Sequence, residues 1–383
     1  MVTGIICEYN PLHNGHFKQL QLLRSQDPAG CIVCLMSGNF VQRGKPAIFD
    51  KMTRAKAAVL CGADLVLELP ITYALSSAEG FAAGGVEILG KFCDRLCFGA
   101  ETADVRALQA TASALLSPDF SQALTMQLEK GLSFPAARQA ALEAMGIHGD
   151  LISTPNNILA VEYCKAIIAQ NSEMQPMPIL RQGDYHDLQA DKENPSATAV
   201  RELITSAHDW KSCIPAPAIP CFENACVHTL ENAQTAVLAK LRTMTDTEFE
   251  ALPYGSEGLW RKLMHESRSK STLEDILTAV KSKRYTRTRL DRMVMCAFLG
   301  ITEETINSPA PYTRVLAFND KGRQVLKEAR KTGEFINIGQ TADHAYQVLE
   351  SRTTSLYGLF APIPEAPDAE ENYRIFYHEK TDS

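Results

Sequence analysis

Short apolar runs alternate with longer segments of helical spacing over the first 105 residues. Four of the runs predict buried strands, at Gly4–Glu8, Cys31–Met36, Leu65–Leu69 and Arg95–Phe98. The intervening segments predict helices that begin near Gly15, Asp50 and Ser77. Because the strands are apolar on both faces and alternate with helices, we expect an α/β fold with a Rossmann-like parallel sheet. Ligands of such sheets bind beyond the carboxyl ends of the strands.

The pattern changes in the remainder of the chain. Residues 106–206 are mostly helical in spacing, with one further short strand expected at Met177–Leu180. Three prolines, Pro215, Pro217 and Pro220, mark a boundary because proline interrupts both helices and central strands. We therefore predict an α/β domain over residues 1–220 and a smaller, mainly helical domain over residues 221–383.

Composition narrows the class of protein. Hydrophobic residues make up 45% and charged residues 22% of the chain, which is typical of globular proteins. The longest apolar runs are far shorter than the ~20 residues that a membrane helix needs. The start does not resemble a secretory signal, and the eleven cysteines show no repeated spacing. We expect a cytoplasmic protein that associates with no membrane and needs no obligate protein partner.

The net charge of −7 is unevenly distributed. Residues 258–292 contain ten basic residues against four acidic ones, which makes this segment the candidate surface for a polyanion. The candidate contacts are Lys281, Lys283, Arg284, Arg287 and Arg289. A solvated helix face is the alternative interpretation of such a charge run.

The first predicted strand leads into the motif His13-Asn14-Gly15-His16 at the expected start of a helix. The N-terminus of a helix offers unpaired N–H groups to a phosphate, and Gly15 allows the backbone to approach a ligand closely. His13 and His16 could then stabilise charge on the α-phosphate while pyrophosphate leaves. The arrangement is the His-x-Gly-His signature of nucleotidylyl transferases; two surface histidines are the alternative.

Two further segments fit a nucleotide site. Ser196 to Arg201 combines hydroxyls, a helix start and an arginine that could hold phosphate oxygens. Gly99, after the fourth predicted strand, could let adenine or ribose lie against the backbone. A plain capped helix and a simple strand-end turn are the respective alternatives.

Several motifs together resemble the bacterial tRNA(Met) cytidine acetate ligases. They extend from residue 5 to beyond residue 320, and they include Glu8–His16, Met36–Gly44, Gly62–Pro70, Phe98–Glu101, Pro155–Leu159, Arg181 with Tyr185–Asp187, Ser196–Arg201 and Lys283–Thr286. The resemblance implies an enzyme that activates acetate with ATP to acetyl-adenylate and acetylates N4 of the wobble cytidine (C34) of elongator tRNA(Met), forming N4-acetylcytidine. It makes residues 1–220 an ATP-binding, nucleotidyltransferase-like domain, and it makes the basic segment of residues 221–383 a candidate tRNA surface.

The resemblance also implies which residues contact ATP, beside the catalytic His13 and His16. These are Ile6, Cys7, Glu8, Tyr9, Asn10, Pro11, Leu12, Asn14, Gly15, Phe17, Lys18, Gln19, Gly99, Asn157, Arg181 and Gln182, with Ser196 and Arg201 added from the helix start above. Relatives often carry a histidine near Lys18-Gln19, so we assign Gln19 no catalytic role.

No protein-held metal is predicted. Cys213, Cys221, Cys226 and His228 match no common metal-site spacing, and Mg²⁺ is expected to be held mainly through the triphosphate. Two other functions remain open from the residues alone. One is an adenylyltransferase that builds a dinucleotide cofactor, and the other is a non-catalytic nucleotide- and RNA-binding protein.

Overall fold

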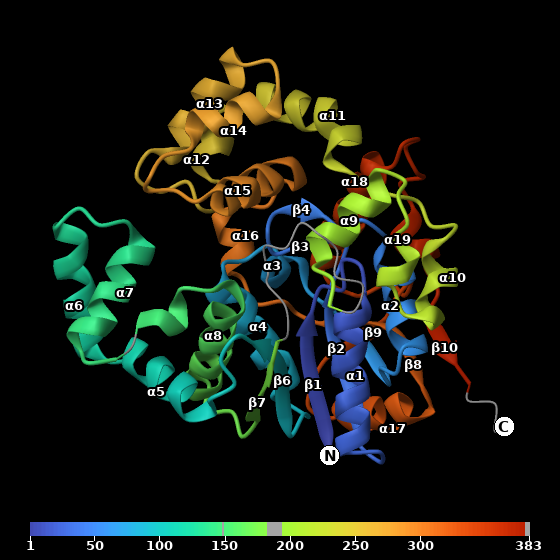
Figure 1. Ribbon diagram of the computed structural model, residues 1–383. Helices are drawn as coiled ribbons and strands as arrows, with labels where there is room; N and C mark the ends of the chain where they lie inside the picture. Colours follow the sequence, from blue (N-terminus) through green and yellow to red (C-terminus); the bar gives the residue numbers. More distant parts are fainter. Residues whose placement is uncertain (148, 182–193, 380–383) are drawn as a thin grey trace.

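The computed structural model describes residues 1–147, 149–181 and 194–379, and its centre is a mostly parallel sheet (Figure 1). The strand order is β10-β8-β5-β2-β1-β6-β7, with β9 paired to β8. The strands are β1 (Val2–Cys7), β2 (Cys31–Ser37), β5 (Leu65–Leu69), β6 (Arg95–Ala100), β7 (Gln175–Leu180), β8 (Thr313–Asn319), β9 (Phe335–Asn337) and β10 (Phe376–His378). Only β5 and β8 pair antiparallel within the described sheet. The predicted α/β fold with a mostly parallel sheet is confirmed.

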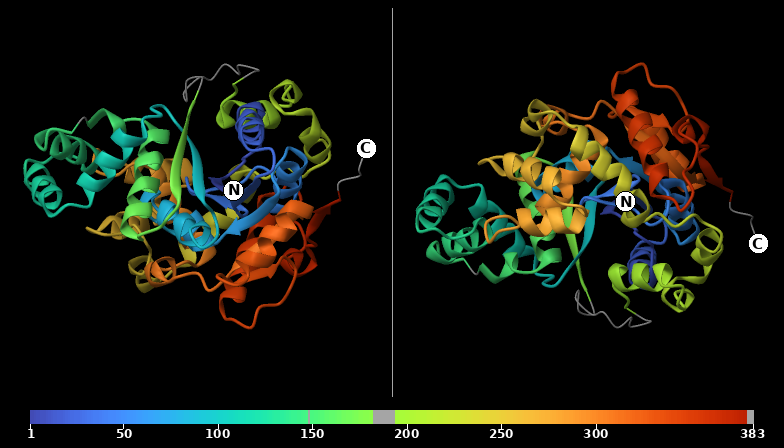
Figure 2. Two further views of the ribbon diagram at one scale, coloured as in Figure 1. Left: turned by 90° about the horizontal axis from the view of Figure 1, so that it is seen from below. Right: turned by 90° about the horizontal axis from the view of Figure 1, so that it is seen from above.

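Helices cover both faces of the sheet because side chains alternate along each strand. Ile6 and Leu35 lie in one hydrophobic core, with residues of α4 (Ala78–Leu89), α8 (Pro155–Ala169) and α17 (Asp320–Ala329). Their neighbours Ile5 and Cys34 lie in a second core, with residues of α1 (Asn14–Gln26) and α2 (Lys51–Leu60). The two layers are visible in the views along the sheet (Figure 2).

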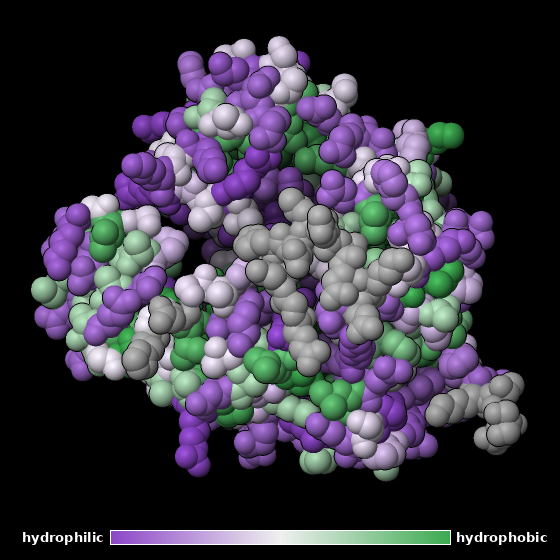
Figure 3. Space-filling view, viewed as in Figure 1, coloured by the Kyte–Doolittle hydropathy of each residue, from purple (hydrophilic) through white to green (hydrophobic). Residues whose placement is uncertain are grey.

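Three helices form a lobe beside the sheet. They are α5 (Val105–Leu115), α6 (Pro118–Glu129) and α7 (Phe134–Ala144). Figure 1 shows α6 and α7 projecting away from the strands, and a recess separates them from the helices above the sheet in the space-filling view (Figure 3).

A helical unit lies beyond the carboxyl end of β1 (Figure 1). It comprises α11 (Leu230–Thr243), α12 (Asp246–Glu250), α13 (Leu259–Ser269), α14 (Leu273–Val280), α15 (Arg287–Leu299) and α16 (Glu303–Asn307). Its core includes Val237, Leu263, Ile276 and Met293, and Phe40 of the α/β part joins that core. The expected helices in this range are therefore present.

The chain then returns to the sheet, which the sequence analysis did not predict. β8 adds to β5, and its apolar residues Val315, Leu316 and Ala317 are completely buried. α18 (Tyr346–Tyr357) and α19 (Ala369–Asn372) follow before β10 completes the edge. Residues 221–383 thus contain a helical unit and three strands of the main sheet, while the division at residue 220 stays a prediction.

A small hairpin, β3 (Phe40–Val41) with β4 (Lys45–Pro46), connects the two parts. Gly44 in its turn has φ of +71° and lies against the backbone of α15, where an added Cβ would be 2.4 Å from the Arg292 nitrogen. The Lys45 ammonium pairs with the Asp291 carboxylate at 3.1 Å. The hairpin turn and α15 are therefore in direct backbone contact.

No helix in the described parts of the chain is long and apolar enough to cross a membrane.

Candidate active site

The two histidines of the motif together form the N-terminal cap of α1, directly after β1. His13 is the N-cap residue, and its Nδ1 accepts a hydrogen bond from the Gly15 N–H at 3.1 Å. The Nδ1 of His16 accepts from the His13 N–H at 3.4 Å. The rings stack with centroids 3.7 Å apart. The backbone of one helix turn therefore holds both imidazoles in a fixed arrangement.

Both imidazoles are neutral near pH 7. Burial, followed by the positive charges of His16, Arg181 and Arg201, holds the pKa of His13 well below its usual range. Burial and then Arg181 lower the pKa of His16 to about 3. Because each Nδ1 accepts a hydrogen bond, the ring proton of each neutral imidazole is on Nε2. The pair thus offers two N–H donors, as an oxyanion requires.

Arg181 and Arg201 approach the histidines from two different elements. Arg181 directly follows β7, and its guanidinium donates to the Asn156 side-chain oxygen at 3.0 Å. Arg201 is on α9 (Ala197–Thr205), and it donates to the Asn10 carbonyl at 2.7 Å. The Ser196 hydroxyl caps α9 by accepting from the Ala199 N–H. Two arginines therefore place positive charge beside the motif.

The end of β6 lies beside the start of α8. Asn157 is 3% exposed, and its amide bonds the backbone N–H and the hydroxyl of Thr102. Glu101 accepts from Thr154, Asn156 and the Asn157 N–H, and these bonds, against the opposing effect of burial, lower its pKa. A Cβ at Gly99 would be 3.0 Å from the Arg181 side chain. The sheet thus brings Gly99, Asn157 and Arg181 together.

Other residues of the first loop support its shape. Ile6, Leu12 and Tyr9 are at most 8% exposed and pack in the cores. Glu8 accepts from the Gln42 N–H, and the Asn10 side chain accepts from the Ile48 N–H, both at 2.8 Å.

The first helix carries the remaining candidates of the motif region. Asn14 donates to the Ser212 carbonyl, Lys18 to Asn194, and Gln19 to the Cys97 sulfur. Cys7 and Phe17 are packed against the core on the α1 side, and Pro11 is buried. These ATP contacts stay predictions, and Gln182 lies outside the described residues, as do Tyr185–Asp187.

Arg54 has a role that the sequence analysis did not find. Its side chain is completely buried, and its guanidinium donates to the carbonyls of Glu8, Ser37, Gly38 and Phe49. It therefore ties the loop after β1 to the loop after β2. Nothing in the spacing of this lysine- and arginine-containing helix distinguishes Arg54 from a solvated residue.

The basic segment is exposed but partly neutralised. Arg284 pairs with Glu257, and Arg287 pairs with Glu274 and Asp291. Arg289 donates to the Tyr254 carbonyl and to Ser256. Within the described residues, the exposed Lys281 and Lys283 have no ion-pair partner. The positive charge that no described acidic side chain pairs with therefore lies on Lys281 and Lys283, and on Arg289, which bonds neutral groups.

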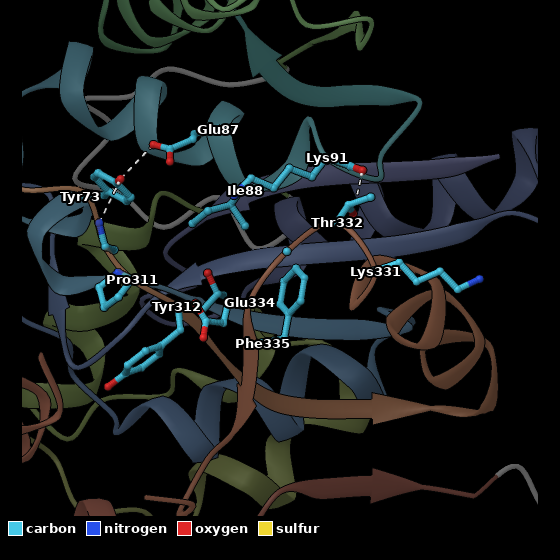
Figure 4. A pocket seen from close by; sticks show the side chains of 13 residues that line it. Tyr73, Glu87, Ile88, Lys91, Pro311, Tyr312, Lys331, Thr332, Glu334 and Phe335 are labelled. Atoms are coloured by element: carbon cyan, nitrogen blue, oxygen red, sulfur yellow. Dashed lines mark hydrogen bonds between the residues drawn. The ribbon is translucent and has the colours of Figure 1, made fainter. Parts of the chain in front are cut away.

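A hollow of about 340 Å³ lies elsewhere, between α4 and the segments 310–313 and 331–335. Figure 4 shows Tyr73, Glu87, Lys91 and Phe335 around it, with the Tyr73 hydroxyl donating to Glu87. None of the motif residues lines this hollow, so it is not the candidate active site.

A parallel sheet with paired histidines capping its first helix defines a nucleotidyl transferase of the HIGH class. The sequence model of the family described as HIGH Nucleotidyl Transferase matches residues 1–372, and the chain belongs to that family.

Comparison with individual proteins identifies the branch of this family to which the chain belongs. The chain is 36% identical to the tRNA(Met) cytidine acetate ligase of Clostridium acetobutylicum, over 94% of this chain and 95% of that protein. It is 35% identical to the ligase of Acetivibrio thermocellus, over 86% of each protein. Within the HIGH nucleotidyl transferases, it is thus a member of the tRNA(Met) cytidine acetate ligase family.

Solved structures agree with this placement. The apo crystal structure of Thermotoga maritima TmcAL superimposes with a TM-score of 0.91 at 28% identity, covering 99% of this chain and 100% of that one. The same protein bound with alpha-thio ATP gives a TM-score of 0.88, with the same identity and the same coverage of both chains.

Proposed function

We propose that this chain activates acetate with ATP and transfers the acetyl group to N4 of the wobble cytidine of elongator tRNA(Met). One acetate oxygen attacks the α-phosphorus, and diphosphate leaves, which yields acetyl-adenylate. The N4 amine then attacks the acyl carbon, AMP leaves, and one N4 proton is lost. The names of the relatives and the ATP analogue bound to the Thermotoga protein support this activity.

The paired histidines carry the chemical part of the proposal. The first step needs no nucleophile from the protein, because acetate itself attacks. It needs positioning and stabilisation of charge on the phosphate oxygens. The Nε2–H groups of neutral His13 and His16 suit this role, with the N-terminus of α1 between them. Arg181 and Arg201 add positive charge nearby.

Mg²⁺ would enter this site with the nucleotide. Glu8 and Glu101, the acidic residues in the two site loops, are already held by hydrogen-bond donors of the protein. The groups facing the histidines are neutral or positive, which suits phosphate oxygens rather than a bare cation. We therefore assign Mg²⁺ to the triphosphate.

The tRNA would occupy the exposed basic segment around Lys281, Lys283 and Arg284. This segment lies in the helical unit beyond the carboxyl end of the sheet, on the side where parallel sheets bind ligands. A tRNA substrate also places the enzyme in the cytoplasm.

Acetate-dependent exchange of labelled diphosphate into ATP tests the first step. His13→Ala and His16→Ala should each lower the exchange rate about 10² to 10³-fold, because each removes one donor to the developing charge. His265→Ala on the exposed face of α13 is the matched control and should leave the rate unchanged.

The same assay separates the two alternative functions. Exchange that needs a nucleotide-like phosphate instead of acetate would indicate an adenylyltransferase. Binding of ATP and tRNA without any exchange would indicate a non-catalytic protein. Near-normal exchange in both histidine variants would contradict the roles of His13 and His16.

A further inference from the structure

Three metal-ligating side chains from distant parts of the chain lie together outside the nucleotide site. They are Cys226 and His228, between α10 (Ile219–Phe222) and α11, and Glu365, after the short helix Gly358–Phe360. The potential ligand atoms of all three lie within 4.8 Å of one another. Sequence spacing could not reveal this group, because 137 positions separate His228 from Glu365.

The surroundings of the His228 ring leave one nitrogen without a fitting partner. The ring is 3% exposed and stacks on Tyr357, with centroids 4.1 Å apart. Its Nδ1 lies 3.1 Å from the Cys226 carbonyl oxygen, and its Nε2 lies 3.1 Å from a Glu365 carboxylate oxygen. Both neighbours are acceptors, whereas a neutral imidazole has one N–H group. One of the two nitrogens therefore faces an acceptor with no proton of its own to donate, and a cation beside it would satisfy both groups.

We propose that Cys226 Sγ, His228 Nε2 and the Glu365 carboxylate bind a divalent cation of the zinc type. Zinc accepts sulfur, nitrogen and oxygen ligands in a tetrahedron. Bonds of about 2.0 Å give such a tetrahedron an N···O edge of roughly 3.3 Å, close to the observed 3.1 Å. An Nδ1–H group that donates to a backbone carbonyl is also the usual orientation of a metal-bound histidine.

The cluster is accessible to ions from solvent. Glu365 is exposed and Cys226 is half-buried, so an ion can enter from solvent and water can fill a fourth position.

The location assigns the ion a structural role. The His228 N–H donates to the Ile48 carbonyl, and the Thr229 N–H donates to the Phe360 carbonyl, both at 2.9 Å. The Tyr357 hydroxyl donates to the Ala47 carbonyl at 2.8 Å. The ion would therefore fix the junction between the α/β part, the start of α11 and the segment after α18.

Cobalt titration of the full chain tests the site. After treatment with a chelator, Co²⁺ should bind with a stoichiometry near one and produce the charge-transfer absorption of a cobalt–thiolate bond. Cys226→Ser should abolish this absorption. His228→Asn and Glu365→Gln should each weaken Co²⁺ or Zn²⁺ binding more than tenfold, at least the effect of changing an outer partner of a metal ligand.

Cys221→Ser is the matched control, since Cys221 is a half-buried cysteine of the same segment outside the cluster. It should retain the absorption and the affinity. Positions 226 and 365 are partly exposed, so substitutions there should leave the fold intact. Thermal unfolding of each variant verifies this. Absence of a cobalt–thiolate absorption in the unmodified chain, or its persistence in Cys226→Ser, would overturn the proposal and leave a direct contact between His228 and Glu365.

Discussion

At the residue scale, the motif was predictable from the sequence but its internal geometry was not. The spacing of His13 and His16 after an apolar run placed both residues at a helix start. Their mutual capping, with each Nδ1 on a backbone N–H, was not predictable because histidine is not a preferred capping residue. The positive charges that lower the histidine pKa values come from distant elements, Arg181 and Arg201, which the motif itself does not indicate.

The low histidine pKa values predict a pH-dependent stability. Because the pKa of His16 is about 3 in the folded protein, the unfolded chain binds one more proton between pH 3 and about 6.5. The free energy of unfolding is therefore fully maintained above pH 6.5 and decreases as the pH falls through this range. His16→Asn should make the slope shallower by up to about 1.4 kcal/mol per pH unit. Urea unfolding at a series of pH values measures it, and an unchanged slope would contradict the assignment.

Arg54 predicts a large effect of a conservative change. Arg54→Lys keeps the charge but cannot reach four carbonyls, so buried acceptors lose their donors. Each such loss costs about 1–3 kcal/mol, and we expect a destabilisation of at least about 3 kcal/mol. Chemical denaturation checks this value, with Lys56→Arg on the same helix as the control. A loss below about 1 kcal/mol would show that the loops do not depend on the guanidinium.

At the element scale, the five strands predicted between residues 4 and 180 are present, whereas the strands of the last 71 residues were missed. α2 was expected near its observed start because its cap, Asp50, precedes clear helical spacing. β8 was missed because its short apolar run lies among helical segments, and its strand conformation depends on pairing with β5. The sequence pattern of a short segment cannot indicate that it pairs with a strand some 250 residues away.

The basic segment predicts a salt-dependent tRNA affinity that is separate from acetate activation. Changing Lys283, Arg284 and Arg287 together to Ala should weaken tRNA binding. It should also reduce the steepness with which the logarithm of the binding constant falls against the logarithm of the salt concentration, by about two to three units if all three residues contact phosphates. Since Arg284 is already paired with Glu257, and Arg287 with Glu274 and Asp291, we expect a value at or below the lower end of this range. Acetate-dependent diphosphate exchange should stay near normal.

The matched control changes Arg323 and Lys327 on α17, which are exposed on the opposite side of the molecule (Figure 1). This pair should leave both the affinity and the slope unaltered. Filter-binding titrations over a range of salt concentrations provide both quantities. Equal slopes for the triple variant and the unmodified chain would make the segment a solvated surface.

At the scale of the whole molecule, the sheet depends on both ends of the sequence. β8 and β10 come from the last 71 residues, yet they cover the β5 edge of strands from the first 70. A fragment of residues 1–220 would expose β5 as an unpaired apolar edge, which favours aggregation. We expect this fragment to form aggregates detectable by light scattering under conditions where the full chain stays monodisperse. A monodisperse, folded fragment would instead support an independent domain ending at residue 220.

The contact of Gly44 with α15 fixes the distance between the two histidines and the cations of Lys281–Arg284. Because two backbones touch without an intervening side chain, the loop after β2 and the helix that follows Lys281–Arg284 cannot slide past one another. A tRNA bound to those cations could present a base to the histidines only if its own dimensions match that distance. The enzyme would then select its RNA by length and shape, before it makes any contact with a particular base.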